Sequence, residues 1–118
     1  MGGTFDPIHN GHIRMAIESC EALGLSSITL VPAADPPHRD APRVNAARRL
    51  AMVAESVQDI AQLEVDGREL QRSGKSYSFA TACEFRAEVG MDASLTMIMG
   101  ADAFLGFTSW HRWQEFLE

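Results

Sequence analysis

Cysteine is scarce in this 118-residue sequence, which has only Cys20 and Cys83 and no CxxC pair. Two cysteines cannot supply the disulfide framework of a small secreted domain, so we expect both to be buried thiols in a cytoplasmic setting. No apolar run approaches the roughly 20 residues that span a bilayer, and the N-terminus has no signal-peptide pattern. These absences predict a protein that has no membrane partner.

Basic residues are also in short supply. Sixteen acidic residues against ten basic ones give a net charge of −6. A general nucleic-acid binder must neutralise many phosphates, so nucleic acid is not an expected partner, and any phosphate site must be local. With 46% hydrophobic and 22% charged residues, the chain has the composition of a single globular domain over residues 1–118.

Helical periodicity alternates with short β-rich runs along the chain, which is the pattern of an α/β fold. The expected helices cover residues 11–23, 45–57, 79–89, 101–107 and 110–117. The expected strands cover residues 28–31, 63–65 and, as the most hydrophobic run and a central strand, 95–99. Loops are expected over residues 33–43 and 67–76. The stripes expected to face the core are Ile13, Ala16, Ile17, Cys20 and Leu23 on the first helix, which ends at Gly24, and Leu50, Val53, Ala54 and Val57 on the second.

The most informative stretch is GGTFDPIHNGH, residues 2–12. It is a glycine-rich loop that runs into the start of the first helix, where backbone N–H groups have no partner within the helix. Such a helix start binds phosphate, and His9 and His12 add two imidazole donors. In an arbitrary sequence these histidines more often cap the helix, and an aspartate before a proline, as at Asp6, most often builds a turn. A metal site of His9, His12 and His38 is disfavoured, because no carboxylate or cysteine stands beside them at a ligand spacing.

Four further motifs follow in order: PPHR at 36–39, SYS at 76–78, GAD at 100–102 and WHRW at 110–113. Together with HNGH at 9–12, this ordered set resembles the nucleotidyltransferases that carry an HxGH signature, and among them the nicotinate mononucleotide adenylyltransferases. The resemblance implies a Rossmann-like open parallel sheet. It also implies transfer of the adenylyl group of ATP to nicotinate mononucleotide, giving deamido-NAD and pyrophosphate, with Mg²⁺ bound together with ATP.

Site residues follow from the same resemblance. His9 and His12 would be catalytic, with His12 on the α-phosphate and His9 on the triphosphate. The residues implied to bind ATP are Gly2, Gly3, Thr4, Phe5, His9, Gly11, His12, Gly100 and Asp102. The residues implied to bind nicotinate mononucleotide are His38, Arg39, Tyr77, Ser78, Asp102, Trp110 and His111. No protein ligand to a metal is expected.

Ordinary structural roles compete with several of these assignments. PPHR could be a charged surface loop, Asp102 could cap the next helix, and Trp113 could belong to the core. Trp110 is the better candidate to stack on a pyridine ring. Backbone N–H donors aimed at a carboxylate would favour nicotinate over nicotinamide mononucleotide, because an amide carries no full negative charge.

The sequence departs from the family pattern at several points. Ser78 stands where threonine is usual, and Thr108 and Ser109 stand where a Pro-Thr pair is common. Only Met1 precedes the glycine pair, and the chain stops before the family's further motif with a terminal basic residue. The resemblance therefore implies an incomplete fold that lacks the first strand and the C-terminal part.

Three other functions stay open. A sister HxGH transferase acting on phosphopantetheine or a polyol phosphate would keep HNGH but has no need of WHRW or SYS. A Rossmann oxidoreductase lacks support, because GGTFDP is not GxGxxG and no acidic residue is placed about 20 positions on to hold a ribose. A catalytically inactive fragment would bind a mononucleotide without turnover. The sequence also leaves a homo-oligomer open.

Overall fold

The computed structural model describes residues 1–34 and 43–117. Its elements, in chain order, are β1 (Gly2–Gly3), α1 (Asn10–Leu23), β2 (Ile28–Pro32), α2 (Ala46–Val57), β3 (Leu63–Val65), α3 (Arg68–Gln71), α4 (Ser78–Val89), α5 (Ala101–Leu105) and the 3₁₀ turns η1 (Phe107–Ser109) and η2 (Glu115–Leu117). This order confirms the predicted α/β class. Within the described ranges, no helix combines the length and the apolar character that crossing a bilayer requires.

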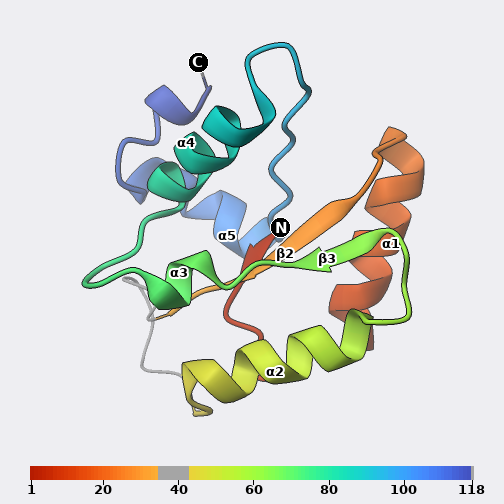
Figure 1. Ribbon diagram of the computed structural model, residues 1–118. Coiled ribbons are helices and arrows are strands. Elements are labelled where there is room, and N and C mark those ends of the chain that lie inside the picture. The colour runs from red at the N-terminus through yellow and green to blue at the C-terminus, as the bar shows by residue number, and fades with distance from the viewer. Residues whose placement is uncertain (35–42, 118) are drawn as a thin grey trace.

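The sheet has three parallel strands in the order β1-β2-β3. Gly2 pairs with Val31, and Ile28 pairs with Leu63. Crossovers between parallel strands are right-handed, so both crossover helices, α1 and α2, lie on one side of the sheet, while α4 and α5 lie on the other (Figure 1). The carboxyl ends of the strands therefore meet at one edge, which is where open parallel sheets bind ligands.

The core lies between the sheet and the two crossover helices. Ile28 and Leu30, alternate residues of β2, face it, as the period of a strand requires. The other buried members of this cluster are Phe5, Ile8, Ala16, Cys20, Val53, Val57 and Leu63.

The ends of α1 and α2 are set by local signals. Gly24 closes α1 in the left-handed conformation, with φ of 61°, as predicted. Asn45 caps α2, because its side-chain oxygen accepts the backbone N–H of Arg48 at 2.9 Å.

Three side-chain predictions are wrong. Leu23, the last residue of α1, is 58% exposed, because the helix ends beyond the part that packs on the sheet. Ala54 is exposed, because the buried residues of α2 follow an i, i+4 stripe that leaves position 54 to one side. Cys83 is exposed on α4, whereas Cys20 is buried as expected.

Several segments also differ from the expected elements. Residues 95–99 form no strand. A strand needs a neighbour to hydrogen-bond with, and β1 is only two residues long. The first strand, expected to be missing, is present as this short β1. Helix α3 lies inside the predicted loop 67–76, and residues 110–117 form turns and η2 rather than one helix.

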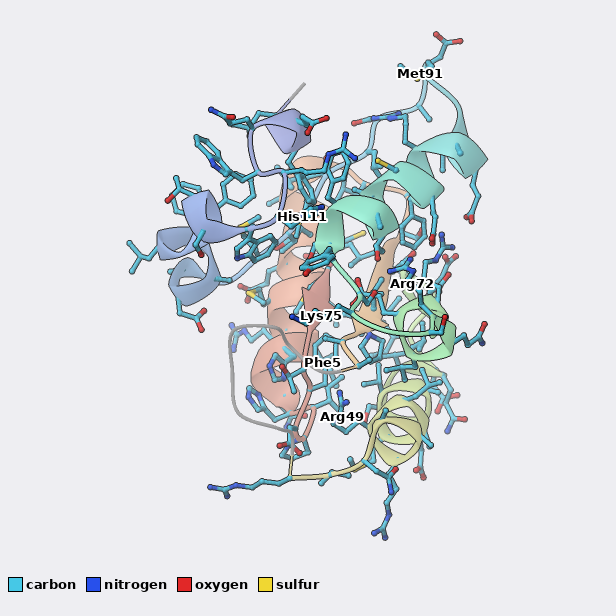
Figure 2. The ribbon with its side chains drawn as sticks, turned by 90° about the vertical axis from the view of Figure 1, so that its left-hand side faces the viewer. Phe5, Arg49, Arg72, Lys75, Met91 and His111 are labelled. Carbon is cyan, nitrogen blue, oxygen red and sulfur yellow. The ribbon has the colours of Figure 1, made fainter. Side chains whose placement is uncertain are left out.

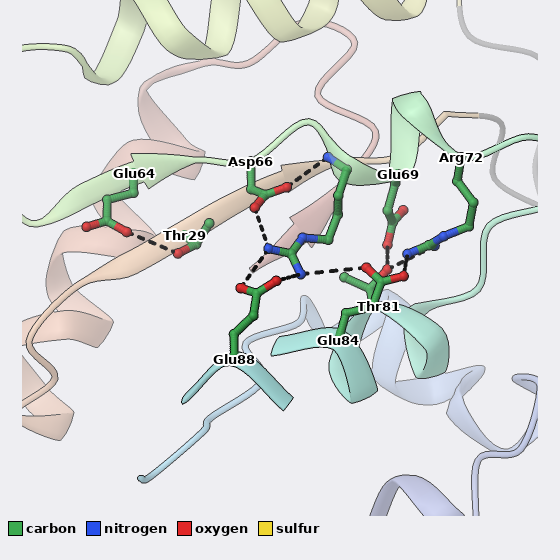
Figure 3. A network of polar contacts seen from close by, with 9 residues as sticks. Thr29, Glu64, Asp66, Glu69, Arg72, Thr81, Glu84 and Glu88 are labelled. Atoms are coloured by element: carbon green, nitrogen blue, oxygen red, sulfur yellow. Dashed lines mark hydrogen bonds and ion pairs between the residues drawn. The ribbon is translucent and has the colours of Figure 1, made fainter. Parts of the chain in front are cut away.

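A polar network joins α3 to α4 (Figure 3). Arg68 donates to Asp66 at 2.7 Å and to Glu88 at 2.9 Å, and its guanidinium carbon lies 3.7 Å from the centre of the Phe85 ring. Arg72 donates to Glu84 at 2.7 Å. These contacts fix the segment between the two helices, which carries Ser76 and Tyr77.

Candidate active site

An open cleft of about 1490 Å³ lies at the carboxyl edge of the sheet. Most residues that the sequence assigns to substrates line it. These are Gly2, Gly3, Thr4, Phe5, His9, His12, Tyr77, Ser78, Gly100, Asp102, Trp110 and His111. Gly11 is not part of this lining, and His38 and Arg39 lie outside the described residues. The structure thus brings residues from both ends of the chain to one place.

His9 and His12 form the start of α1. The backbone N–H of Gly11 donates to His9 Nδ1 at 3.1 Å, and the backbone N–H of His9 donates to His12 Nδ1 at 3.2 Å. The two rings stack with centres 3.8 Å apart, and the His12 ring lies nearly perpendicular to the Phe5 ring, with ring centres 5.1 Å apart. Capping and ligand binding are therefore compatible, because capping uses only one nitrogen of each ring.

The tautomer of both imidazoles follows from these bonds. A nitrogen that accepts an N–H carries no proton, so a neutral ring must carry its proton on Nε2. Within residues 1–34 and 43–117, neither Nε2 takes part in a hydrogen bond. The pKa of His12 is lowered below its usual 6.5, mainly by burial and to a smaller extent by the neighbouring His9. At neutral pH His12 is thus an uncharged ring with an Nε2–H donor to offer.

Glycines allow the close packing of this turn. A Cβ on Gly11 would lie 3.0 Å from both Cε1 and Nδ1 of His9. A Cβ on Gly3 would lie 3.0 Å from two carbons of the buried Phe5 ring. Such distances are shorter than normal contacts, so a larger residue at either position would displace the ring beside it.

Asp6 has a structural role in the same loop. Its two carboxylate oxygens accept the backbone N–H groups of Arg43 at 2.8 Å and Val44 at 3.1 Å. The N-terminal loop is thereby tied to the start of α2. This matches the turn-building role predicted for an aspartate before proline.

The other wall of the cleft is aromatic. Tyr77, just before α4, stacks on His111 with ring centres 4.5 Å apart, and Figure 2 shows His111 beside the start of α4. Trp110 is half-buried, and its ring lies 5.5 Å from that of the buried Phe107. Trp113 contacts Phe107 as well, at 6.2 Å. Phe107 therefore anchors both tryptophans, of which only Trp110 lines the cleft.

Asp102 lies in the first turn of α5, two residues after Gly100. A Cβ on Gly100 would lie 2.8 Å from Asp102 Oδ1, so glycine at position 100 leaves room for this carboxylate at the cleft.

Two cleft features were not predicted from the sequence. Glu69 of α3 is buried at the cleft wall and accepts the hydroxyl proton of Thr81 at 2.7 Å. Burial raises the pKa of Glu69 above its usual 4.5, although the Thr81 bond opposes this. Arg49 of α2 is the other, a buried guanidinium bonded to backbone carbonyls behind the cleft. Its i, i+4 spacing from Val53 was the available signal, because it places position 49 on the buried stripe.

Comparison with known proteins identifies the fold. The sequence model of one family, described as cytidylyltransferase-like, matches residues 1–118, which is the whole chain. This chain belongs to the cytidylyltransferase-like family. The parallel sheet and the cleft at its carboxyl edge agree with that membership, and the expectation of a nucleotidyltransferase fold is confirmed.

Individual curated proteins are also similar to this chain. A "probable nicotinate-nucleotide adenylyltransferase" of Pseudomonas putida (strain W619) is 52% identical over 118 residues, and one of Pseudomonas fluorescens is 49% identical over 118. These matches cover all of this chain but 54% and 55% of the two relatives. The chain thus spans about half the length of the curated relatives it matches.

The carboxylate side chains that line the cleft indicate how a magnesium ion would be bound there. Asp6 and Glu69, two of the three carboxylates that line the cleft, the third being Asp102, already accept protein hydrogen bonds, and no group of three metal-ligating side chains occurs among the described residues. Mg²⁺ readily takes phosphate oxygens and water as ligands. These residues therefore suit a magnesium ion that is carried by a nucleotide rather than held in a protein cage.

Proposed function

We propose that this protein transfers the adenylyl group of ATP to nicotinate mononucleotide, giving deamido-NAD and pyrophosphate. The observation that carries the proposal is the stacked His9–His12 pair at the start of α1, facing an aromatic wall across one cleft. The names of relatives about half identical to this chain support the same reaction.

The proposed reaction needs positioning more than proton transfer. A phosphate oxygen of the mononucleotide attacks the α-phosphorus of ATP, and the bond from that phosphorus to the oxygen of the β-phosphate breaks as pyrophosphate leaves. The nucleophile is already anionic, so no general base is required. This explains why the cleft offers N–H and hydroxyl donors and has no need of a serine, histidine and aspartate triad.

Each part of the cleft has a role in the proposal. His12 donates from Nε2 to the α-phosphate and steadies its charge during transfer, and His9 donates to the triphosphate. Backbone N–H groups of the N-terminal loop, among them that of Phe5, receive the remaining phosphate oxygens, while the Gly11 N–H stays on His9 Nδ1 and holds that ring in place. Magnesium bound with ATP neutralises part of the phosphate charge. The neutral state of His12 at neutral pH supports a role as donor.

The aromatic wall receives the mononucleotide in this proposal. Trp110 stacks on the pyridine ring, and backbone N–H groups near Ser78 and His111 bind its carboxylate. Asp102 binds a ribose hydroxyl, and His38 and Arg39 serve the mononucleotide phosphate or ribose. Preference for the acid over the amide follows, since N–H donors attract a full negative charge. We also propose a cytoplasmic location, which two unpaired cysteines support.

The test is an enzyme assay. The longest protein product of the gene, termed the full-length protein, is assayed in parallel with the 118-residue chain. Each is incubated with ATP, magnesium and either nicotinate or nicotinamide mononucleotide, and dinucleotide is separated by chromatography. We expect deamido dinucleotide with the acid and slower product with the amide. Faster turnover of the amide would contradict the specificity, and no product with either would contradict the reaction.

A second candidate is a mononucleotide-binding protein without turnover, favoured by the aromatic wall of Tyr77, Trp110 and His111, which suits a mononucleotide whether or not ATP reacts. Calorimetric titration with ATP and with mononucleotide separates the two. Binding of both ligands without product supports this second candidate for the form tested.

A further inference from the structure

Arg49 is buried deeply, with 1% of its surface exposed. Its guanidinium donates to four backbone carbonyls: from Nε to Val44 at 2.9 Å, from Nη1 to Thr4 at 2.6 Å and Ala33 at 2.7 Å, and from Nη2 to Ala34 at 2.8 Å. None of the carboxylates in residues 1–34 and 43–117 forms an ion pair with it. Carbonyl dipoles therefore provide the partners that a buried charge requires.

These carbonyls come from three separate segments. Thr4 follows β1, Ala33 and Ala34 follow β2, and Val44 precedes α2. Thr4, Ala33 and Ala34 line the cleft, whereas Arg49 does not. Figure 2 shows Arg49 close to Phe5, where the N-terminal loop meets α2. The guanidinium thus links these three backbone segments on the side that faces away from the cleft.

The bond to Thr4 controls one peptide group. Phe5 has a φ of 50°, in the left-handed region that non-glycine residues adopt only at an energetic cost. The Thr4–Phe5 peptide is trans, so its C=O and N–H point in opposite directions. Since Arg49 holds the Thr4 oxygen, the Phe5 N–H points away from the guanidinium. Within the described ranges this N–H donates to no protein acceptor.

We propose that Arg49 is a positioning residue that turns the Phe5 N–H toward the cleft, ready to donate to a polyphosphate oxygen. The proposal rests on the proposed function, because it requires a cleft that receives polyphosphate. The left-handed Phe5 is the cost of this orientation, and the hydrogen bond from a charged donor offsets it. Loss of the hydrogen bond to the Thr4 oxygen would let the Thr4–Phe5 peptide rotate to a relaxed conformation. In that conformation the Phe5 N–H would no longer point toward the cleft.

Arginine is the residue that this arrangement needs. Its planar fork reaches carbonyls of several segments at once, whereas a lysine has three donors on a single nitrogen and cannot span them in the same way. Arg49→Lys therefore keeps the positive charge but loses the planar group that reaches several carbonyls at once. Arg48, the exposed neighbour on α2, provides the matched control.

The experiment uses full-length protein labelled with ¹⁵N and titrated with inorganic tripolyphosphate, followed at the Phe5 and Gly11 amides by NMR. Wild type, Arg49→Lys, Arg49→Met and Arg48→Met are compared, with thermal melts to show that each is folded. We expect a Phe5 shift in wild type and Arg48→Met that is lost in both Arg49 variants. The Gly11 shift should persist, because the Gly11 N–H is bonded to the His9 ring and so reports on ligand bound at that ring. We expect their tripolyphosphate Kd to rise roughly tenfold or more.

Three outcomes would overturn the proposal: a Phe5 amide in wild type that does not respond, a folded Arg49→Lys variant with an unchanged Phe5 response, or loss of the response in Arg48→Met as well. If both Arg49 variants fail to fold, the wild-type protein decides through the NMR scalar coupling across the hydrogen bond from Arg49 Nη1 to the Thr4 carbonyl, whose absence would overturn the proposal. A Phe5 response in a protein that forms no dinucleotide would leave this orientation supported and would contradict the proposed reaction, so the two failures are distinguishable.

Discussion

The imidazole of His9 lies on that of His12, with ring centres 3.8 Å apart and planes inclined by 24°. Each ring accepts a backbone N–H at Nδ1, which leaves both Nε2 atoms as the donors. We therefore predict that ¹⁵N NMR finds the neutral form of each ring in the Nε2–H tautomer. A protonated Nδ1 on a neutral His12 would contradict this arrangement.

Acid should destabilise the protein through His12. Because the folded pKa of His12 is lowered from 6.5, the unfolded chain takes up this proton first as the pH falls. The stabilisation is thus complete above pH 6.5 and is lost as the pH falls through the folded pKa. Urea unfolding from pH 7 downward should show that His12→Gln, which retains an amide donor and acceptor, loses less stability than wild type below pH 6.5. Identical slopes for the two proteins would contradict the prediction.

Gly11→Ala should separate stability from ligand binding. Alanine favours a helix over glycine by up to about 1 kcal/mol, so the melting temperature should hold or rise if the His9 ring simply moves aside. The new methyl group would displace that ring, because its Cβ would lie 3.0 Å from His9 Nδ1. Calorimetry should therefore find weaker ATP binding. Asn10→Ala, on the exposed neighbour, is the control and should leave ATP affinity unchanged.

The pH dependence of stability that comes from Glu69 should have the opposite sign to that from His12, and Glu69→Gln should remove it. The raised pKa of the buried Glu69 means that the folded state holds this proton more tightly, so stability falls as the pH rises from 4.5 through the folded pKa. Glutamine can still accept the Thr81 hydroxyl but does not ionise. Unfolding followed over this range should therefore show a smaller decline in the variant, whereas Glu55→Gln on the exposed face of α2 should behave as wild type.

Trp110→Ala should affect one substrate alone. Loss of a stacking ring costs about 1–3 kcal/mol per base, so the KM for nicotinate mononucleotide should rise about tenfold while the KM for ATP stays constant. Phe104→Ala, a truncation at a largely exposed position of α5, is the matched control. Equal increases in both KM values would indicate a general disturbance of the fold and contradict the assignment.

Much of the fold could be predicted where local signals agree. Gly24, Asn45 and the helical stripes fixed α1 and α2 within about a residue, and apolar runs located β2 and β3. Residues 95–99 show the limit of this reasoning. Their hydrophobicity predicted a central strand, but pairing depends on a neighbour that the two-residue β1 does not provide, and Met97 and Met99 line the cleft instead.

The residues of the site also fall into those that the sequence predicted and those that it did not. A motif such as HNGH reveals groups that donate to a ligand, and the structure gathers most of these residues in one cleft. Arg49 and Glu69 were missed because their side chains act across the fold. A charged residue on a helix is usually exposed, and only the segments that converge on Arg49 supply enough carbonyls to bury it.

The most direct measurement is the kcat for deamido dinucleotide formation by full-length wild type, His12→Ala and the His9→Ala/His12→Ala double variant, with Asn10→Ala as control. Removal of one donor to the transition state costs about 2.7–4 kcal/mol, so we predict that His12→Ala lowers kcat by about a hundredfold to a thousandfold, and the double variant by more. Asn10→Ala should retain wild-type kcat. A folded double variant that forms dinucleotide at the wild-type rate would contradict the account.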